Sequence, residues 1–185
     1  MSRINNYRQA ALFLDRDGVI NIEKNYLFKI EDVEFVEGIF ELCYLAKQKD
    51  LAIVVVTNQA GIGRGYYTEA QFQELMGWMK IKFEKAGAPI AAVYFCPYHP
   101  IHGVGIYRKD SFERKPNPGM LLLAADEMDL DLERSIMIGD KGSDIKAAKS
   151  AGVKSTMLLG VDNESSEPDW VISSLVEAYT ILETL

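Results

Sequence analysis

Three short apolar runs, rich in β-branched and aromatic residues, are typical of strands that are buried on both faces. They span residues 10–14, 51–56 and 135–138. Segments of helical character separate these runs, and the alternation predicts an α/β fold, a Rossmann-like parallel sheet with helices on both faces. Ligands bind at the carboxyl edge of such sheets, so the polar residues after each run are candidates for one shared site.

One helix has clear signals at both ends and an apolar face. Thr68 and Gln71 have the spacing of a capping box, and Gly87 marks the end of the helix. Between them an apolar stripe recurs at helical spacing: Phe72, Leu75, Met76, Met79 and Phe83. This stripe predicts a face packed on the core rather than a ligand site.

Two further helix starts are predicted from capping residues. Asn117 is expected to cap a helix with Pro118 at its first position. Ser143 or Asp144 is expected to begin a short helix that Gly152 ends. Asp144 is therefore either a cap or a secondary partner of a metal site, and the sequence favours neither.

Two carboxylates, Asp15 and Asp17, stand one residue apart directly after the first apolar run. Buried unpaired charge is costly, so this pair is a poor structural element. It suits a reaction centre in which one carboxylate is a nucleophile and the other carries a proton. A solvated turn would explain an isolated pair, but hydroxyl, amide and carboxylate groups also follow the second and third runs.

Four segments together resemble the motifs of the haloacid dehalogenase-like phosphatases, over residues 10–160. They are Asp15-Arg16-Asp17-Gly18, Thr57-Asn58-Gln59, Arg114-Lys115-Pro116 and Gly139-Asp140-Lys141. The resemblance implies that Asp15 is the nucleophile, which becomes an aspartyl-phosphate, and that Asp17 is the general acid and base. It also implies that Thr57 and Lys115 bind the phosphoryl group that is transferred. Arg114 is counted with the catalytic residues and is expected to contact the sugar phosphate beyond that group.

The same resemblance implies a Mg²⁺ site formed by Asp15, Asp140 and the backbone carbonyl of Asp17. The charges support it independently, because three carboxylates would repel a phosphate dianion unless cations neutralise the site. Mg²⁺ prefers such a set of oxygen ligands.

Longer strings around these motifs are similar to the D-glycero-D-manno-heptose-1,7-bisphosphate 7-phosphatases and to the related histidinol-phosphate phosphatases. The family resemblance implies a phosphoric monoester hydrolase of heptose biosynthesis that acts on the 7-phosphate of the sugar. It places substrate contacts at Glu23, Lys24, Asn25, Tyr26, Asn58, Gln59, Ala60, Arg114 and Lys141. Arg64 lies among glycines and is a separate candidate for binding the second phosphate.

Members of this family commonly carry a structural zinc, held by a Cys-x-His pair and a later Cys-x-Cys pair. The corresponding positions here are Cys96, Tyr98, Ser111 and Glu113. Tyrosine and serine are poor zinc ligands, so we expect no structural zinc. A different set, Cys96 with His99 and His102, remains an open alternative without a fourth ligand.

The chain of 185 residues is expected to form one domain, residues 1–185. Residues 18–38 are long enough for a flap only, so we expect a site without a large cap domain. No signal peptide or membrane span is evident, and two cysteines do not suggest a disulfide framework. We therefore expect a cytoplasmic, monomeric protein whose partner is a small phosphorylated sugar.

Alternatives to the heptose substrate are weighed by charge and by the motifs. The net charge of −7 opposes nucleic-acid binding, so a 3′-phosphatase of nucleic-acid ends is disfavoured. Histidinol phosphate requires the same chemistry and is the leading alternative. A non-catalytic phosphosugar-binding module would not need Asp15, Asp17, Lys115 and Asp140 together.

Overall fold

The computed structural model describes residues 8–161 and 163–185 and contains one parallel sheet. Within these residues the sheet has six strands in the order β3-β2-β1-β4-β5-β6, with every neighbouring pair parallel. The strands are β1 (Ala11–Leu14), β2 (Ala52–Asn58), β3 (Ile90–Cys96), β4 (Ile136–Gly139), β5 (Ser155–Leu159) and β6 (Trp170–Ile172). The three apolar runs of the sequence are the central strands β1, β2 and β4, as predicted.

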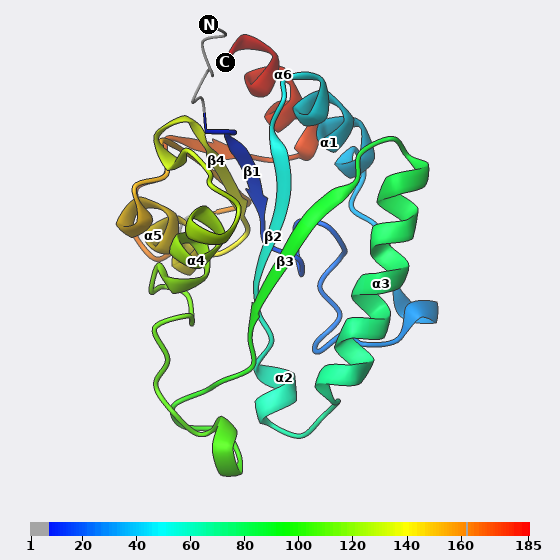
Figure 1. The fold of residues 1–185 in the computed structure, drawn as a ribbon, viewed down its shortest axis with the longest axis vertical. Coiled ribbons are helices and arrows are strands. Elements are labelled where there is room, and N and C mark those ends of the chain that lie inside the picture. Colours follow the sequence, from blue (N-terminus) through cyan, green and yellow to red (C-terminus); the bar gives the residue numbers. More distant parts are fainter. Residues whose placement is uncertain (1–7, 162) are drawn as a thin grey trace, which may run out of the picture.

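Helices cover both faces of the sheet (Figure 1). On one face lie α1 (Ile39–Gln48), α3 (Glu69–Lys85) and α6 (Leu175–Thr184), and on the other lie α4 (Gly119–Glu127) and α5 (Gly142–Ala151). The short helix α2 (Ala60–Gly63) follows β2, and three single 3₁₀ turns are η1 (Ile30–Asp32), η2 (Gly105–Tyr107) and η3 (Leu132–Arg134). The predicted α/β architecture is confirmed, and the part of the chain that the structure describes contains no large cap over the sheet edge.

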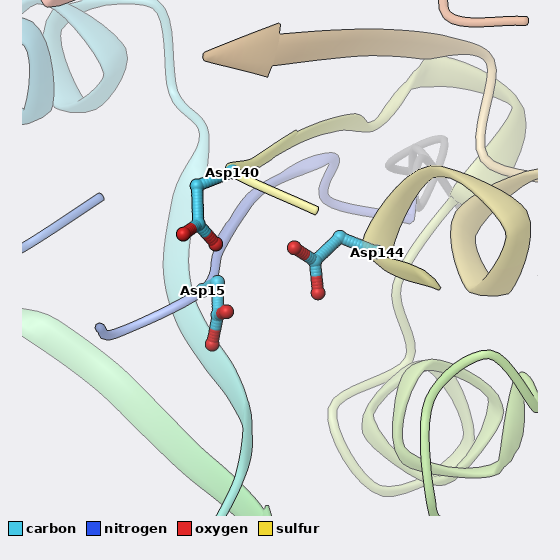
Figure 2. Close-up of side chains that lie close together, drawn as sticks. All are labelled: Asp15, Asp140 and Asp144. Atoms are coloured by element: carbon cyan, nitrogen blue, oxygen red, sulfur yellow. The ribbon is translucent and has the colours of Figure 1, made fainter. Parts of the chain in front are cut away.

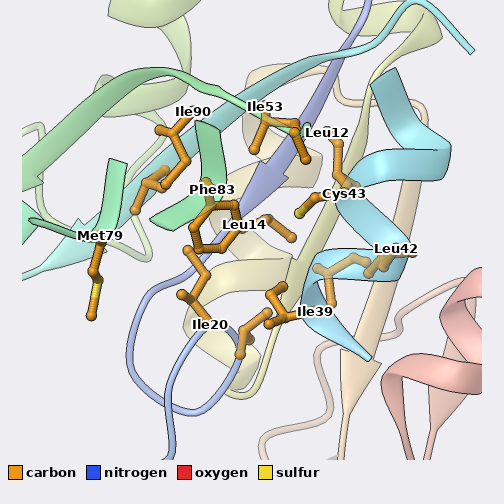
Figure 3. Packing of buried hydrophobic residues seen from close by; sticks show 14 of the residues in the cluster. Leu12, Leu14, Ile20, Ile39, Leu42, Cys43, Ile53, Met79, Phe83 and Ile90 are labelled. Atoms are coloured by element: carbon orange, nitrogen blue, oxygen red, sulfur yellow. The ribbon is translucent and has the colours of Figure 1, made fainter. Parts of the chain in front are cut away.

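Successive side chains of the central strands enter opposite cores, because side chains alternate across a strand. On β1, Leu12 and Leu14 join the core under α1, α3 and α6, whereas Phe13 joins the core under α4 and α5. Figure 3 shows part of the first of these cores, which includes Phe83 of α3, Ile39 of α1 and Leu14 of β1. Burial on both faces explains why these strands are apolar throughout.

The chain leaves β1 toward β2 and β3, and later returns to the other side of β1 to form β4. The junction of β1 and β4 is therefore the topological switch point, where ligands bind in open α/β sheets. Asp15 follows β1 there, and its N–H donates to the carbonyl of Ile138 on β4 at 3.1 Å. None of the helices in the described residues is long and apolar enough to cross a membrane.

The predicted boundaries of α3 are confirmed. The Thr68 hydroxyl accepts from the N–H of Gln71, and the Gln71 side chain accepts from the N–H of Thr68. All five residues of the predicted stripe are buried. This reciprocal capping box satisfies two backbone donors that the first turn of a helix leaves unpaired.

The cap predicted at Asn117 is wrong. Helix α4 begins at Gly119 without a side-chain cap, and the Asn117 amide donates instead to the carbonyl of Ser111 at 3.1 Å. Helix α5 begins at Gly142, one residue before the predicted start, and Gly152 ends it with φ of 88° as predicted. Asp144 lies in the first turn of α5 and accepts from the N–H of Lys141 at 3.0 Å.

Candidate active site

A cleft of about 550 Å³ lies at the carboxyl edge of β1, β2 and β4. Most of the predicted site residues line it: Asp15, Asp17, Glu23, Asn25, Tyr26, Thr57, Asn58, Gln59, Ala60, Arg114, Lys115 and Lys141. Gly61, Tyr67, Ser143 and Asp144 complete the lining. Side chains that are more than 120 residues apart in the sequence thus share one cavity, because the parallel strands end at one edge.

Lys115 is the cation at the base of this cleft. It is 3% exposed, and its Nζ lies 3.0 Å from Asp15 Oδ1 and 2.6 Å from Asp144 Oδ1. Nζ also donates to the carbonyl of Val56 at 2.8 Å. Burial alone would lower the pKa of Lys115, but Asp144 and Asp15 outweigh burial and raise that pKa above its usual value. Lys115 is therefore a permanent positive charge beside the Asp15 carboxylate.

The Asn58 side chain fixes the backbone at Lys115. Its amide donates to the Lys115 carbonyl at 3.0 Å and accepts from the Lys115 N–H at 3.1 Å. The Thr57-Asn58-Gln59 segment thus holds the Arg114-Lys115-Pro116 segment in place. The flexible side chain of Lys115 therefore starts from a fixed backbone position.

Three carboxylates converge on a common space (Figure 2). Asp15 after β1, Asp140 after β4 and Asp144 at the start of α5 each offer one oxygen, and these oxygens lie within 4.8 Å of one another. Gly18 permits this approach, because a Cβ on Gly18 would lie 2.2 Å from Asp140 Oδ2, and Gly18 has φ of 89°. Any side chain at position 18 would push Asp140 out of the cluster.

The cluster fits a divalent cation. Burial and then the charge of Asp15 raise the pKa of Asp140 to about 7. Burial also raises the pKa of Asp15 to about 6, against the lowering effect of Lys115 and with the support of Asp144. Asp140 Oδ1 is buried and has no hydrogen-bond partner. Three carboxylates that repel one another, one of them with a buried oxygen that lacks a donor, suit Mg²⁺, which would hold all of them ionised.

Asp17 is held differently from these three carboxylates. Its Oδ1 accepts from Arg16 Nε at 3.1 Å, from Arg16 Nη2 at 2.7 Å and from Asn21 Nδ2 at 3.0 Å. Its Oδ2 accepts from Arg16 Nη2 at 2.7 Å and from Gln59 Nε2 at 3.1 Å. The side chain of Asp17 is thus held by protein donors, and it is not part of the cluster of Asp15, Asp140 and Asp144.

Comparison with known proteins identifies the family. Residues 112–178 match the model of the HAD-hydrolase-like family. The chain is 53% identical to D-glycero-alpha-D-manno-heptose-1,7-bisphosphate 7-phosphatase of Burkholderia mallei, over 91% of this chain and 89% of that protein. It is 39% identical to the corresponding beta-heptose enzyme of Vibrio cholerae, over 91% of this chain and 90% of that protein. The chain belongs to the heptose-1,7-bisphosphate 7-phosphatase family.

A solved structure of a heptose bisphosphate phosphatase agrees with this assignment. The enzyme of B. bronchiseptica, crystallised with magnesium and phosphate, superposes with a TM-score of 0.81. The match covers 95% of this chain and 98% of that one at 27% identity. The heptose bisphosphate phosphatase fold is therefore present along nearly the whole chain.

The flap of this heptose bisphosphate phosphatase spans residues 18–38. It places three of the predicted substrate contacts in the cleft and one outside it. Glu23, Asn25 and Tyr26 line the cleft, and Asn25 and Tyr26 both have left-handed φ angles, 49° and 68°. Such angles are strained for residues other than glycine and recur at functional sites. Lys24 does not line the cleft; its Nζ lies 3.2 Å from Glu34 and donates to the carbonyl of Asp32.

The three basic residues predicted to bind the substrate lie at different positions relative to the cleft. Arg114 lines the cleft, and its Nη1 donates to the carbonyl of Tyr98 at 3.1 Å. Lys141 lies at the mouth, with its Nζ 3.7 Å from Glu23 across the cleft. Arg64 does not line the cleft; its Cζ lies 5.7 Å from the centre of the Tyr26 ring.

The positions that correspond to zinc ligands in the family hold a protein contact instead. Ser111 donates to the carboxylate of Glu113, and Cys96 is fully buried with Sγ 4.0 Å from the carbonyl of Tyr98. Burial raises the pKa of Cys96, which disfavours a metal-binding thiolate. The other candidate ligands do not join Cys96 in a metal-sized cluster within the described residues.

Arg16 and Tyr67 contact predicted site residues, and sequence reasoning assigned neither of them to the site. Arg16 is 0% exposed and binds Asp17, and the Tyr67 hydroxyl donates to Gln59 Oε1 at 2.5 Å. The signal for Arg16 was present, because a basic residue between two carboxylates after a buried strand has a partner on either side. Tyr67 left no such signal, since the contact depends on how α2 turns back toward β2.

Proposed function

We propose that this protein is a Mg²⁺-dependent phosphatase that hydrolyses the 7-phosphate of D-glycero-D-manno-heptose 1,7-bisphosphate through an aspartyl-phosphate. The observation that carries the proposal is the buried Asp15 carboxylate at the switch point, 3.0 Å from Lys115 and facing Asp140. An anionic nucleophile beside a fixed cation suits attack on a phosphate ester. The identity of 53% with a heptose bisphosphate phosphatase supports the choice of substrate.

The reaction proceeds in two displacements on phosphorus. First, an Asp15 oxygen bonds to phosphorus while the bond from phosphorus to the sugar oxygen breaks, and Asp17 gives its proton to that oxygen. Then water attacks phosphorus, Asp17 takes a proton from the water, and the bond to Asp15 breaks to release phosphate. Lys115 and Thr57 bind the phosphoryl oxygens throughout.

Mg²⁺, held by Asp15, Asp140 and the backbone carbonyl of Asp17, would supply positive charge to the phosphoryl oxygens. Asp144 pairs with Lys115 at 2.6 Å and places a further negative charge beside this site. Lys115 and the ion would together offset the negative charges of the carboxylates and of the reacting phosphate, as phosphoryl transfer requires.

We propose further that the alpha anomer of the 1-phosphate is preferred. The Burkholderia mallei relative, at 53% identity, is an alpha-heptose enzyme, whereas the relative from Vibrio cholerae, at 39%, is a beta-heptose enzyme. Arg114 and Lys141 line the open side of the cleft and are the residues best placed to contact the sugar phosphate.

The test is phosphate release from both anomers of the heptose bisphosphate and from histidinol phosphate, with and without Mg²⁺. We expect the highest kcat/KM for the alpha anomer, no turnover without Mg²⁺, and a product that keeps its 1-phosphate by ³¹P NMR. Asp15→Asn is the control for contaminating phosphatases. A higher kcat/KM for histidinol phosphate, or release of the 1-phosphate, would contradict the proposal.

A further inference from the structure

Arg16 is a buried charge for which the reaction described above has no use. Its side chain is 0% exposed, although guanidinium groups are costly to bury unless they are paired and hydrogen-bonded. The position lies between the proposed nucleophile and the proposed general acid. A buried arginine between these two residues therefore needs an explanation other than packing.

The guanidinium of Arg16 is fixed on three sides. Asp17 is its carboxylate partner within the described residues, and Nε and Nη2 together make three contacts of 2.7 to 3.1 Å with it. Nη2 also donates to the carbonyl of Leu27 in the flap at 2.9 Å, and Cζ lies 5.6 Å from the centre of the Phe72 ring of α3. A planar group that is held in this way presents a fixed edge to Asp17.

Gln59, directly after the neighbouring strand β2, supports the same carboxylate. Its Nε2 donates to Asp17 Oδ2 at 3.1 Å and to Thr57 Oγ1 at 2.9 Å. The Tyr67 hydroxyl donates to the other end of the amide, and burial raises the pKa of Tyr67 to about 12, so this donor keeps its proton. The amide therefore turns its NH₂ toward Asp17, and no donor on the Gln59 side chain is left for a substrate.

We propose that Arg16 is a positioning residue that aims the Asp17 carboxyl at the leaving oxygen, and that Gln59, oriented by Tyr67, is its second support. The inference rests on the proposed function, because it takes Asp17 as the proton donor. Proton transfer requires the donor within hydrogen-bond reach of the leaving oxygen, and small misplacements reduce the rate strongly. A single-bond rotation of Asp17 would otherwise carry the carboxyl away from the cleft.

The experiment compares two aryl esters of similar shape, phenyl phosphate and 4-nitrophenyl phosphate, by kcat/KM with Mg²⁺ present. Phenolate needs a proton to leave, whereas 4-nitrophenolate is stable enough to leave without one. For Arg16→Met we expect a loss of about a hundredfold or more on phenyl phosphate and under about fivefold on 4-nitrophenyl phosphate. Arg16→Lys, which keeps one charged donor, should recover part of the loss on phenyl phosphate.

Two controls bracket this measurement. Asp17→Asn removes the proton donor itself and should show the same selective loss. Arg8→Met removes an exposed arginine that pairs with Asp129 at 2.8 Å, far from the cleft, and should change neither ester. Gln59→Leu should show the same selective loss on phenyl phosphate as Arg16→Met. If Arg16→Met does not fold, Gln59→Leu and Arg16→Lys together test whether the loss is selective.

Equal losses on the two esters, in Arg16→Met or in the two substitute variants, would overturn the inference and leave Arg16 as a support of the fold alone. Selective loss in Asp17→Asn without selective loss in the Arg16 variants would also overturn it, while the proposed function would stand. Failure of the wild-type protein to release phosphate from the heptose bisphosphate would contradict the proposed function, and the aryl esters would still decide the role of Arg16.

Discussion

In the proposed reaction, the Asp15 carboxylate must stay ionised to attack phosphorus and must also bind Mg²⁺. Its burial works against ionisation, and Lys115 at 3.0 Å works for it. The ionisation of Asp15 therefore depends on the neighbouring positive charge rather than on exposure to water. This balance makes the carboxylate of Asp15 hard to replace by any neutral group.

Asp15→Asn should reduce kcat by more than about a hundredfold while the fold is kept, because an amide neither attacks phosphorus as a carboxylate does nor binds Mg²⁺ as well. Steady-state phosphate release, beside circular dichroism of the same sample, checks this expectation. A kcat above about a tenth of the wild-type value would show that another group is the nucleophile.

Arg114→Ala should lower kcat/KM for the heptose bisphosphate about ten- to two-hundredfold, the loss of one charge-assisted hydrogen bond, and affect 4-nitrophenyl phosphate little. Arg114 lines the cleft but does not contact Asp15 or Lys115 through its side chain, whose Nη1 bonds to Tyr98. Parallel measurements on both esters check the prediction. Equal losses would mean that Arg114 acts on the reacting phosphoryl group or on the fold.

Some residues could be placed from the sequence and others could not, for a physical reason. Asp15, Thr57 and Asp140 follow apolar runs, so local pattern placed them at the sheet edge. Lys24 was expected in the cleft, but the left-handed turn at Asn25 and Tyr26 directs the chain so that Lys24 pairs with Glu34 instead. Local pattern carries no information about such turns, because the strain is maintained by distant contacts.

Among the elements, α3 shows how far local rules reach. Its cap, stripe and end were all predicted, because each depends on residues within one helix. The start of α4 was not, because Asn117 bonds to Ser111 in a loop that the sequence alone does not place. Elements that are set by their own residues can be predicted, whereas ends that are set by neighbouring loops cannot.

Thr68→Ala should destabilise the protein by about 1 kcal/mol, the usual value of an N-cap side chain, and lower Tm by about 2–4 °C. The cap lies on α3 outside the cleft lining, so kcat/KM should not change. Thermal unfolding and an aryl phosphate assay on the same preparation measure the two effects. An unchanged Tm would mean that packing of the α3 stripe alone determines the stability of this helix.

The loop between β3 and α4 should bind no zinc at one ion per chain, because Ser111 and Glu113 satisfy each other and Cys96 is a buried thiol. Elemental analysis of the purified protein, with Tm before and after chelation, checks this. The combined variant Tyr98→His, Ser111→Cys and Glu113→Cys is the matched positive control and should acquire zinc. Zinc in the wild-type protein, lost together with stability on chelation, would contradict the prediction.

At the scale of the whole molecule, the acidic cluster links stability to pH and to metal. The pKa values of Asp15 and Asp140 in the folded protein, about 6 and about 7, lie above the ordinary value of 3.8. The metal-free fold therefore binds more protons than the unfolded chain, and this contribution to stability is complete below about pH 4 and lost as the pH rises through 6 and 7.

Mg²⁺ should therefore raise Tm more at about pH 8 than at about pH 5, because at low pH the ion must displace protons from the same carboxylates. Thermal unfolding with and without Mg²⁺ at both pH values measures the difference. Asp140→Asn should remove most of it. An equal effect of Mg²⁺ at both pH values would place the ion elsewhere on the protein.

The one-domain organisation of residues 1–185 stays a prediction that cooperative unfolding would test. The six strands of a single sheet, with both cores shared between distant segments, lead us to expect one transition seen alike by circular dichroism and by tryptophan fluorescence. Two separate transitions would contradict it.

The end of the chain lies at the edge of the sheet opposite the cleft, where α6 packs beside α1 (Figure 1). A tether joined to Leu185 would leave the molecule with its catalytic edge facing away from a support. The protein could thus be immobilised on a bead or electrode by a C-terminal tag, and sugar phosphates in a flowing solution would reach every cleft without passing the attachment surface.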